Sequence, residues 1–221
     1  MIKRLALLHT VSFLADMFRK LLQENLPNVE HFHMVDEGII RELMAHGKLT
    51  PKVIRRIGTQ AFFAQETGAD LILFTCSSTS PAVDIVRNFV DIPILKIDEP
   101  MVKHAIELGE AIGVVATART TQEPSVSLIE SAARKEGRKV RVQCVLESAA
   151  FHAKLEGDTP RHDQLVKDAV HRLAQNNDVV VLAQASMAHL AEVLGKEVRV
   201  PVLASPGFCI KALEEIAERK G

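Results

Sequence analysis

Short apolar runs along the chain predict the strands of a buried sheet. Each run is rich in Leu, Ile and Val and lacks the alternation of a half-exposed strand. Parallel strands that are covered on both faces show this pattern. The predicted strands are Leu5–His9, Leu71–Thr75, Ile94–Ile97, Ile112–Ala116, Val140–Val145, Val179–Ala183 and Val202–Ala204.

Amphipathic segments lie between these runs and predict helices. Their apolar residues recur every three or four positions, as on a helix with one buried face. The predicted helices are Ala15–Glu24, Pro51–Thr67, Met101–Leu108, Val126–Glu136 and Gln164–Asn176. A chain in which strands and helices alternate folds as an α/β protein with a doubly wound parallel sheet.

The composition fits a globular protein and argues against two classes of function. The 221 residues carry a formal net charge of −1, with 25% charged and 47% hydrophobic residues. Nucleic-acid binding is not expected, because basic residues do not cluster and the chain has neither Trp nor Tyr for base stacking. Membrane insertion is not expected either, because no apolar run approaches the roughly 20 residues of a membrane span.

The cysteines and the start of the chain bear on the compartment. Three cysteines at wide spacing predict neither a disulfide framework nor a zinc site. The apolar start of the chain is interpreted as the first strand, because no small-residue cleavage site of a signal peptide follows it. We therefore expect a cytoplasmic protein with reduced thiols.

The sequence contains an internal repeat. The run that ends at Cys76 matches the run that ends at Gln184 at a shift of 108 residues. The next Pro-initiated strands match at the same shift, and the strand ending at Thr10 matches the one ending at Thr117 at a shift of 107 residues. A near-constant shift over several segments argues against chance.

The repeat predicts two pseudo-symmetric α/β halves. They comprise residues 1–97 and 98–204, with residues 205–221 completing the first half. In open α/β sheets, ligands bind beyond the carboxyl ends of the strands. If the halves face each other with those ends, the active site lies between them, and Cys76 and Gln184 occupy opposite walls.

The turn TCSSTSP, residues 75–81, carries the most informative cysteine. Cys76 ends a buried strand, and the hydroxyl residues and proline after it predict the start of a helix. The amino end of a helix favours a thiolate and binds anions. The alternative is a cysteine that packs as a small apolar residue, but a core thiol needs no run of hydroxyl residues. Cys76 is therefore the candidate catalytic residue, with Ser77 and Ser78 as substrate-binding candidates.

Gln184 is the counterpart of Cys76 in the repeat and the second catalytic candidate. Its amide group could donate hydrogen bonds to a substrate carboxylate or oxyanion. The alternative is a glutamine that ties down its own turn. The turn that follows contributes Ala185 and Ser186 as further substrate-binding candidates.

Threonines follow the first strand of each half. Thr10 and Thr117 can offer hydroxyl and backbone N–H groups to a carboxylate, or they can cap their turns. Thr120 is a further substrate-binding candidate, but its spacing to Glu123 is that of a capping box, which would make it the start of a helix.

The remaining cysteines and the histidines carry less signal. Cys144 in an apolar strand and Cys209 on an amphipathic terminal helix are interpreted as structural. The nine histidines are interpreted as scattered surface or capping residues, so no metal site is expected. Neither GxGxxG nor GxxxxGK[ST] occurs, so no nucleotide cofactor is expected.

Four segments in order resemble the aspartate/glutamate/hydantoin racemase superfamily. They are, along the chain, TCSST around Cys76, KIDEPM at residues 96–101, IGVVAT ending at Thr117 and LAQASM around Gln184. The resemblance implies cofactor-independent proton transfer at the carbon next to a carboxylate of a small amino acid, hydantoin or related acid. In the racemases one cysteine takes the proton from one face and a second returns it on the other. Carried over, Cys76 is the first cysteine, and Ser77, Ser78 and Thr117 belong to the anion-binding turns.

The sequence departs from this pattern at Gln184, where the family has its second cysteine. An amide cannot exchange a proton at neutral pH, so several alternatives stay open. Racemisation could use another group for the second face, such as His189 or a water. The enzyme could be a one-base isomerase, or a single-cysteine lyase or decarboxylase of a malonate-like acid. Cys76 could also attack a substrate carbon covalently. The chain could also be a non-catalytic protein that binds a small carboxylate. A homo-oligomer is the default assembly for enzymes of this kind.

Overall fold

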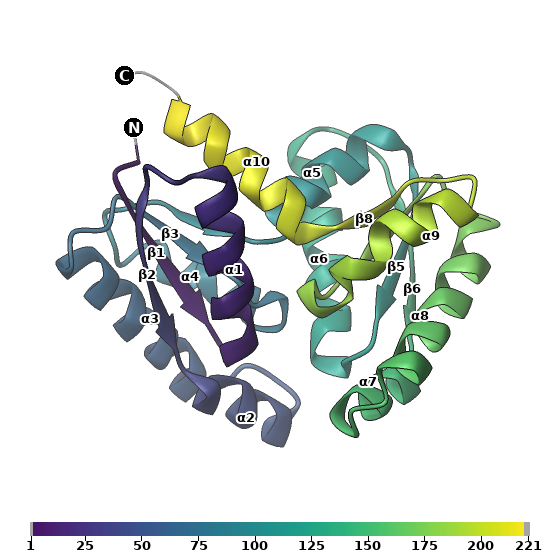
Figure 1. Cartoon of the computed structure of the whole chain (residues 1–221), viewed down its shortest axis with the longest axis horizontal. Helices are drawn as coiled ribbons and strands as arrows, with labels where there is room; N and C mark the ends of the chain where they lie inside the picture. Colours follow the sequence, from purple (N-terminus) through teal and green to yellow (C-terminus); the bar gives the residue numbers. More distant parts are fainter. Residues whose placement is uncertain (1, 219–221) are drawn as a thin grey trace. The chain divides into compact units, whose positions relative to one another are not determined.

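The computed structural model describes residues 2–218 and divides the chain into two units, each built on its own sheet. The described residues of Met1–Ile97 and Cys209–Gly221 form the first unit, and Asp98–Phe208 form the second. Helix α10, Ser205–Glu218, begins in the second unit and ends in the first (Figure 1). No helix among the described residues has both the length and the apolar character needed to cross a membrane.

The first unit has a four-stranded parallel sheet with the order β2-β1-β3-β4. Its strands are β1 (Arg4–His9), β2 (Glu30–Val35), β3 (Leu71–Phe74) and β4 (Ile94–Lys96). The helices are α1 (Ser12–Asn25), α2 (Glu37–His46), α3 (Pro51–Glu66) and α4 (Ser80–Val86), with a 3-10 turn at Ser77–Thr79 before α4.

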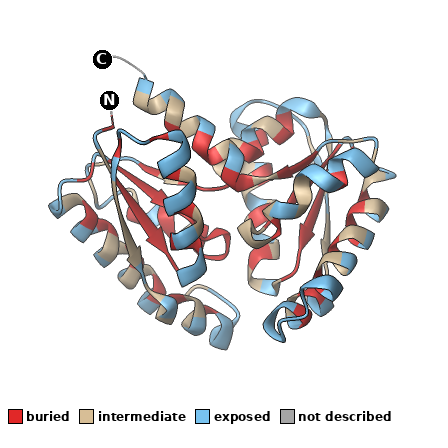
Figure 2. Cartoon of the chain, in the orientation of Figure 1, coloured by how far each residue is buried: buried red, intermediate tan, exposed pale blue. Residues whose placement is uncertain are grey.

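Both faces of this sheet are covered, as its apolar strands require. On one face Ala6 and Leu8 of β1 pack with Ile57 of α3 and Val83 of α4 in a single buried cluster. The alternate residues of β1 point to the other face, which α1 covers. The buried strands stand out in red between the partly exposed helices (Figure 2).

The second unit has a sheet of the same kind, with the order β6-β5-β7-β8. Its strands are β5 (Ala111–Ala116), β6 (Arg141–Leu146), β7 (Val179–Leu182) and β8 (Val202–Ala204). The helices are α5 (Glu99–Leu108), α6 (Arg119–Lys135), α7 (Ser148–Leu155), α8 (Thr159–Ala174) and α9 (Ala191–Glu197), with a 3-10 turn at Ala185–Leu190. Helices α5 and α6 pack on one face of the sheet, and α7, α8 and α9 pack on the other.

Equivalent aspartates lie directly before the second central strand of each sheet, β3 and β7. The carboxylate of Asp70 accepts hydrogen bonds from the backbone N–H groups of Lys3 and Arg4, at 2.7 and 2.9 Å. The carboxylate of Asp178 accepts from those of Glu110 and Ala111, at 3.0 and 2.8 Å. In each unit an aspartate thus ties the start of one central strand to the start of its neighbour.

The α/β fold with parallel sheets expected from the sequence is confirmed, and each of the seven predicted strands is present. Strand β2 was not predicted. It lies at the edge of its sheet, and its EHFHMV sequence alternates polar with apolar residues, so it lacks a continuous apolar run. Helices α2, α7 and α9 are short and were also missed, and α6 begins seven residues before its predicted start at Val126.

Candidate functional site

The sheet register places the candidate residues side by side within each unit. In the first sheet Leu8 pairs with Phe74, so Thr10 and Cys76 follow two residues later on neighbouring strands. In the second sheet Val115 pairs with Leu182, and Thr117 and Gln184 follow in the same way. The candidates therefore form two groups, each at the carboxyl edge of its own sheet.

Cys76 lies in a turn of buried hydroxyl residues. Its thiol is free, and the residue is 8% exposed. Ser77 and Ser78 are also 8% exposed, and the two hydroxyl residues after them are more deeply buried. Such a turn can present hydroxyl and backbone N–H groups to a small ligand with little competing water.

The helix predicted directly after Cys76 is preceded by a 3-10 turn. Residues Ser77–Thr79 form that turn, and α4 begins only at Ser80. Thr79 is the N-cap residue of α4, but its side chain makes no capping hydrogen bond, so the capping role expected of the hydroxyl residues is wrong for it. The predicted place of Pro81 in the first turn of the helix is confirmed.

Helix α4 is fastened to the sheet behind this turn. The buried ammonium group of Lys96, at the end of β4, lies 2.7 and 2.8 Å from the carboxylate oxygens of Asp84 on α4. The guanidinium group of Arg87 donates two hydrogen bonds to the carbonyl oxygen of Ile94, at 2.7 and 3.1 Å. These contacts hold α4, the helix that follows the Cys76 turn, against the sheet.

A buried hydrogen-bonded chain reaches the residue before Cys76. The Thr75 hydroxyl donates to the Leu8 carbonyl oxygen at 3.0 Å, so its oxygen accepts from Nδ1–H of His9 at 2.9 Å. Nε2 of His9 then accepts from Nδ1–H of His33 at 2.9 Å, and the two rings stack with centroids 5.1 Å apart. This sequence of donors fixes one neutral tautomer for each histidine.

His9 and His33, the two histidines of this hydrogen-bonded chain, are both held neutral. Burial, with His33 and Arg19 nearby, lowers the pKa of His9 to about 3. Burial, with Arg19 and His31 nearby, lowers the pKa of His33 to about 4, and Asp16 opposes this only in part. Nε2 of His33 is buried and has no hydrogen-bond partner within the described residues. At neutral pH the pair therefore acts as a fixed hydrogen-bonding support for Thr75.

The contact between His9 and His33 was not predicted from the sequence. His33 belongs to an HFH pattern with His31, which puts both rings on one face of β2, so the interpretation of the histidines as scattered is wrong here. The alternating histidines of this pattern were the signal that could have pointed to His33. No group of three or more metal-ligating side chains occurs within residues 2–218.

The side-chain oxygen of Gln184 occupies a site formed by three donors. It accepts from the Thr117 N–H at 2.7 Å, from the Thr117 hydroxyl at 2.9 Å and from the Ala118 N–H at 3.3 Å. Backbone N–H groups can only donate, so the atom that faces them is the oxygen of the amide. Gln184 thus bridges the turn after β7 to the turn after β5.

This contact also fixes where the amide nitrogen of Gln184 can point. The oxygen is held by Thr117 and Ala118, so the NH2 group must point away from them. Nothing in the described part of the chain accepts a hydrogen bond from it, and Gln184 is only partly buried. The group can therefore donate two hydrogen bonds to an anion.

The other candidates of the second unit are placed by the same two turns. Ala185 and Ser186 begin the 3-10 turn after Gln184 and are half-buried. Thr120 does not start a helix, because α6 begins at Arg119 and its N-cap residue is Ala118, without a capping side chain. Thr120 therefore lies in the first turn of α6, close in sequence to Thr117.

His189, the expected alternative for proton exchange, is engaged by a carboxylate. Its Nε2 atom lies 3.1 Å from both carboxylate oxygens of Asp163 on α8. Nδ1 of the buried His162 lies 2.7 Å from the same carboxylate. The pKa of Asp163 is lowered, because hydrogen bonds from His162 and His189 outweigh the opposing effect of burial. This arrangement ties the 3-10 turn after Gln184 to α8.

Cys144 and Cys209 lie outside both groups of candidates. Cys144 is in β6, where burial raises the pKa of its thiol to about 11, so it is a poor source of thiolate at neutral pH. Cys209 is fully buried in α10.

Comparison with known proteins gives one consistent result. The family model described as Asp/Glu/Hydantoin racemase matches residues 10–213. Glutamate racemase from Rippkaea orientalis (strain PCC 8801 / RF-1) is 22% identical over 219 residues, which cover 96% of this chain and 73% of that protein.

Solved structures show the same likeness at the level of the fold. Picrophilus torridus aspartate racemase aligns with a TM-score of 0.74 and 15% identity, over 99% of this chain and 95% of that one. Allantoin racemase from Klebsiella pneumoniae aligns with a TM-score of 0.70 and 17% identity, over 97% of this chain and 87% of that one.

Proposed function

Because the chain belongs to the Asp/Glu/hydantoin racemase family, we propose that it is a racemase or isomerase in which Cys76 exchanges a proton with its substrate. The exchanged proton is on the carbon next to a carboxylate or, in a hydantoin, next to a ring carbonyl. The observation that carries the proposal is a free thiol at the carboxyl end of a central strand, in a buried turn of hydroxyl residues.

The proposed step is a simple proton transfer. The Cys76 thiolate takes the proton from the α-carbon and becomes a thiol, while the electron pair of the C–H bond delocalises into the neighbouring carboxylate or, in a hydantoin, into the ring carbonyl. Hydroxyl and N–H donors stabilise the charge that develops there. Thr10, Ser77 and Ser78 are the proposed donors in the first unit. The step draws on side chains alone, without a cofactor.

Gln184 is proposed to bind the anion rather than to exchange a proton. Its oxygen is bound to Thr117 and Ala118, which supports a fixed NH2 group as a donor to the carboxylate. Thr120, Ala185 and Ser186 belong to the same proposed binding turns. Because the family's second cysteine is replaced here, the second face of the α-carbon would receive its proton from water or from His189.

The substrate is proposed to be a small carboxylate or hydantoin-like acid. The relatives are named for glutamate, aspartate and allantoin, and these compounds form the first test panel. The use of a free thiol in the reaction suits a reducing cytoplasmic compartment, and we expect a homo-oligomer.

The test is chiral chromatography of each pure enantiomer in the panel, together with aspartate amides and hydantoins, after incubation with the protein. We expect the wild-type chain to convert at least one compound to its opposite enantiomer or to an isomer. Cys76→Ala should lower that rate by at least about 1000-fold, as the loss of an acid–base group does. A variant with the wild-type rate would remove Cys76 from the mechanism.

A single-cysteine lyase or decarboxylase is the second candidate, and the amide at position 184 favours it. With Cys76 as the only proton donor, a malonate-like acid would lose CO2, and the carbanion left behind would take its proton from the Cys76 thiol on one face only. Such a product would be a single enantiomer. CO2 release from substituted malonates, without racemisation of any panel compound, would decide for this candidate. Binding of a panel compound without any turnover would indicate a non-catalytic protein that binds a small carboxylate.

A further inference from the structure

A fixed negative charge lies beside the turn that follows β1. The sheet order places β2 on one side of β1, and β3, which leads to the catalytic candidate, on the other. Val35, the last residue of β2, pairs with His9, and the N–H of Asp36 donates to the His9 carbonyl oxygen at 3.0 Å. Asp36 and Glu37, the N-cap and the first residue of α2, therefore lie next to the Thr10 turn.

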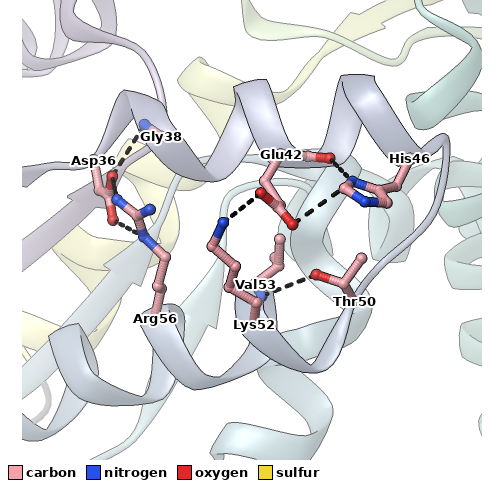
Figure 3. Close-up of polar contacts among 8 residues, drawn as sticks. All are labelled: Asp36, Gly38, Glu42, His46, Thr50, Lys52, Val53 and Arg56. Atoms are coloured by element: carbon pink, nitrogen blue, oxygen red, sulfur yellow. Dashed lines mark hydrogen bonds and ion pairs between the residues drawn. The ribbon is translucent and has the colours of Figure 1, made fainter.

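Both neighbours of Glu37 in the sequence are held in place. The Asp36 carboxylate accepts hydrogen bonds from the Gly38 N–H at 3.0 Å and from Nε–H of Arg56 at 2.7 Å, and it makes a second contact with the same guanidinium group (Figure 3). A Cβ atom at Gly38 would lie 2.6 Å from that group, so a larger residue would displace it. These contacts fix the start of α2, and Glu37 with it.

Glu37 places its charge at the amino end of α1. Its carboxylate accepts a hydrogen bond from the N–H of Ser12 at 3.2 Å. The N-cap residue of α1, Val11, has no capping side chain, and the first turn of α1 contains no acidic residue. Glu37 thus supplies the anion that this end of a helix favours. Hydrogen bonds from the side chain and the backbone of Ser12 lower the pKa of Glu37, so it is ionised at neutral pH.

The surroundings of this charge suit a neutral group. Val35 at the end of β2 is 44% exposed, and Phe13 in the first turn of α1 is 52% exposed. The arginines of α1 and α2 are already paired, Arg19 within its own helix at 2.6 Å and Arg41 with Glu37 at 3.9 Å. A neutral substituent therefore fits this surface better than a carboxylate does.

The equivalent turn of the second unit has the opposite charge. At the repeat shift of 107 residues, Ser12 corresponds to Arg119, the first residue of α6, which makes no ion pair with another described residue. The residue before α7 donates a backbone hydrogen bond to the end of β5 at 2.7 Å, as the residue before α2 does to the end of β1. Ser148, the first residue of α7, therefore corresponds to Glu37. The first unit presents an anion where the second presents a cation.

We propose that Glu37 makes the enzyme selective for substrates with at most one carboxylate, so that aspartate and glutamate are disfavoured against their neutral analogues. A second carboxylate that reached past Thr10 toward β2 would meet the like charge of Glu37. A neutral substituent would instead contact Val35 or Phe13. Selectivity of this kind comes from a repulsive element as much as from an attractive one. The inference rests on the proposed function, because it names the substrate class of the same site.

Matched pairs of compounds test this selectivity. They are aspartate with asparagine, glutamate with glutamine, and hydantoin-5-acetic acid with its amide. The members of each pair are nearly equal in size and differ in one charge. Deuterium exchange at the reacting carbon gives kcat/KM for each member. Because an amide also makes this proton more acidic, the deciding quantity is the change of the amide-to-acid ratio on substitution.

Glu37→Gln removes the charge and keeps an oxygen that can accept from Ser12. We expect the amide-to-acid ratio to fall by about tenfold, as for a unit charge about 8 Å from the second carboxylate at an effective dielectric constant of roughly 30. Glu24→Gln is the matched control, since Glu24 also pairs with a cation one helical turn away. It lies at the other end of α1, about 18 Å along the helix from Ser12. Its ratio should equal that of the wild type.

Isothermal titration calorimetry repeats the comparison without turnover. If no compound exchanges its proton but the acid-to-amide ratio of dissociation constants falls by about tenfold in Glu37→Gln, the inference stands and the proposed role of Cys76 fails. A ratio that is the same in the wild type, Glu37→Gln and Glu24→Gln overturns the inference and leaves the role of Cys76 untouched. Binding of no member of any pair overturns it as well, because these compounds represent the class that it names.

Discussion

At the scale of single residues, Gln184 is the position at which we infer that this chain differs from a two-cysteine racemase. Its oxygen accepts three hydrogen bonds from Thr117 and Ala118, and its nitrogen is left to donate. The oxygen therefore holds the turn, and the nitrogen is proposed to bind an anion. Substitutions can separate these two roles.

Gln184→Glu keeps an oxygen for the three donors but removes the NH2 group. We expect the free energy of unfolding to be maintained and the KM for a carboxylate substrate to rise by about tenfold or more, because a donor becomes a repelling charge. Gln184→Ala should raise KM as well and also cost about 1–3 kcal/mol of stability, since the donors of Thr117 and Ala118 lose their acceptor. Denaturation and steady-state kinetics measure both effects.

If Gln184→Glu left KM and kcat unchanged for an accepted substrate, the amide nitrogen would have no part in binding. The glutamine would then serve only to tie the two turns together.

At the scale of elements, the strands β1, β2 and β3 are joined by the hydrogen-bonded chain from Thr75 through His9 to His33. Both histidines have a pKa far below the ordinary value of about 6.5 because they are buried. Between pH 6.5 and 4 the unfolded chain therefore binds more protons than the folded one. The contribution of the pair to stability is complete above pH 6.5 and is lost as the pH falls.

His33→Phe removes one of these groups and keeps a ring that can stack on His9. We expect the wild-type free energy of unfolding to fall more steeply than that of the variant between pH 6 and 5. The difference in slope is up to about 1.4 kcal/mol per pH unit, the value for one proton. Urea denaturation followed by circular dichroism suits a chain without Trp or Tyr.

Phe18→Leu is the control for this experiment. The Phe18 ring lies 6.2 Å from the His9 ring, so its truncation destabilises the same region without removing a titrating group. The slope should stay that of the wild type. Parallel curves for wild type and His33→Phe would show that burial does not hold His33 neutral.

The elements also show what the sequence could predict and what it could not. Continuous apolar runs predicted β1, β3, β5 and β7, because strands buried on both faces need them. Edge strand β2 alternates polar and apolar residues and was missed, and His33 was missed with it. An edge strand is buried on fewer sides, so its pattern is weaker.

The candidate residues illustrate the same limit at closer range. The apolar runs predicted that Cys76 and Gln184 each lie at the end of a buried strand. The partners of their side chains could not be predicted, because the contact of Gln184 with Thr117 depends on the pairing of β5 with β7, two strands far apart in sequence. The cap expected at Thr120 failed for a local reason, since α6 begins one residue earlier at Arg119.

At the scale of the whole molecule, two sheets with equivalent strand order each carry their own group of candidate residues. The first group contains a thiol and the second an amide. We propose that the first group transfers the proton and that the second binds the anion, so proton exchange should depend on Cys76 even where net racemisation is slow.

Deuterium exchange at the α-carbon tests this claim most directly. Each enantiomer of aspartate, glutamate and allantoin, and of related hydantoins, is incubated in D2O and followed by proton NMR. We predict loss of the α-proton signal of at least one compound with the wild-type protein and with Cys144→Ala, and none above background with Cys76→Ala. Exchange at the same rate in the wild type and in Cys76→Ala, or no exchange with any compound of the panel, would contradict it.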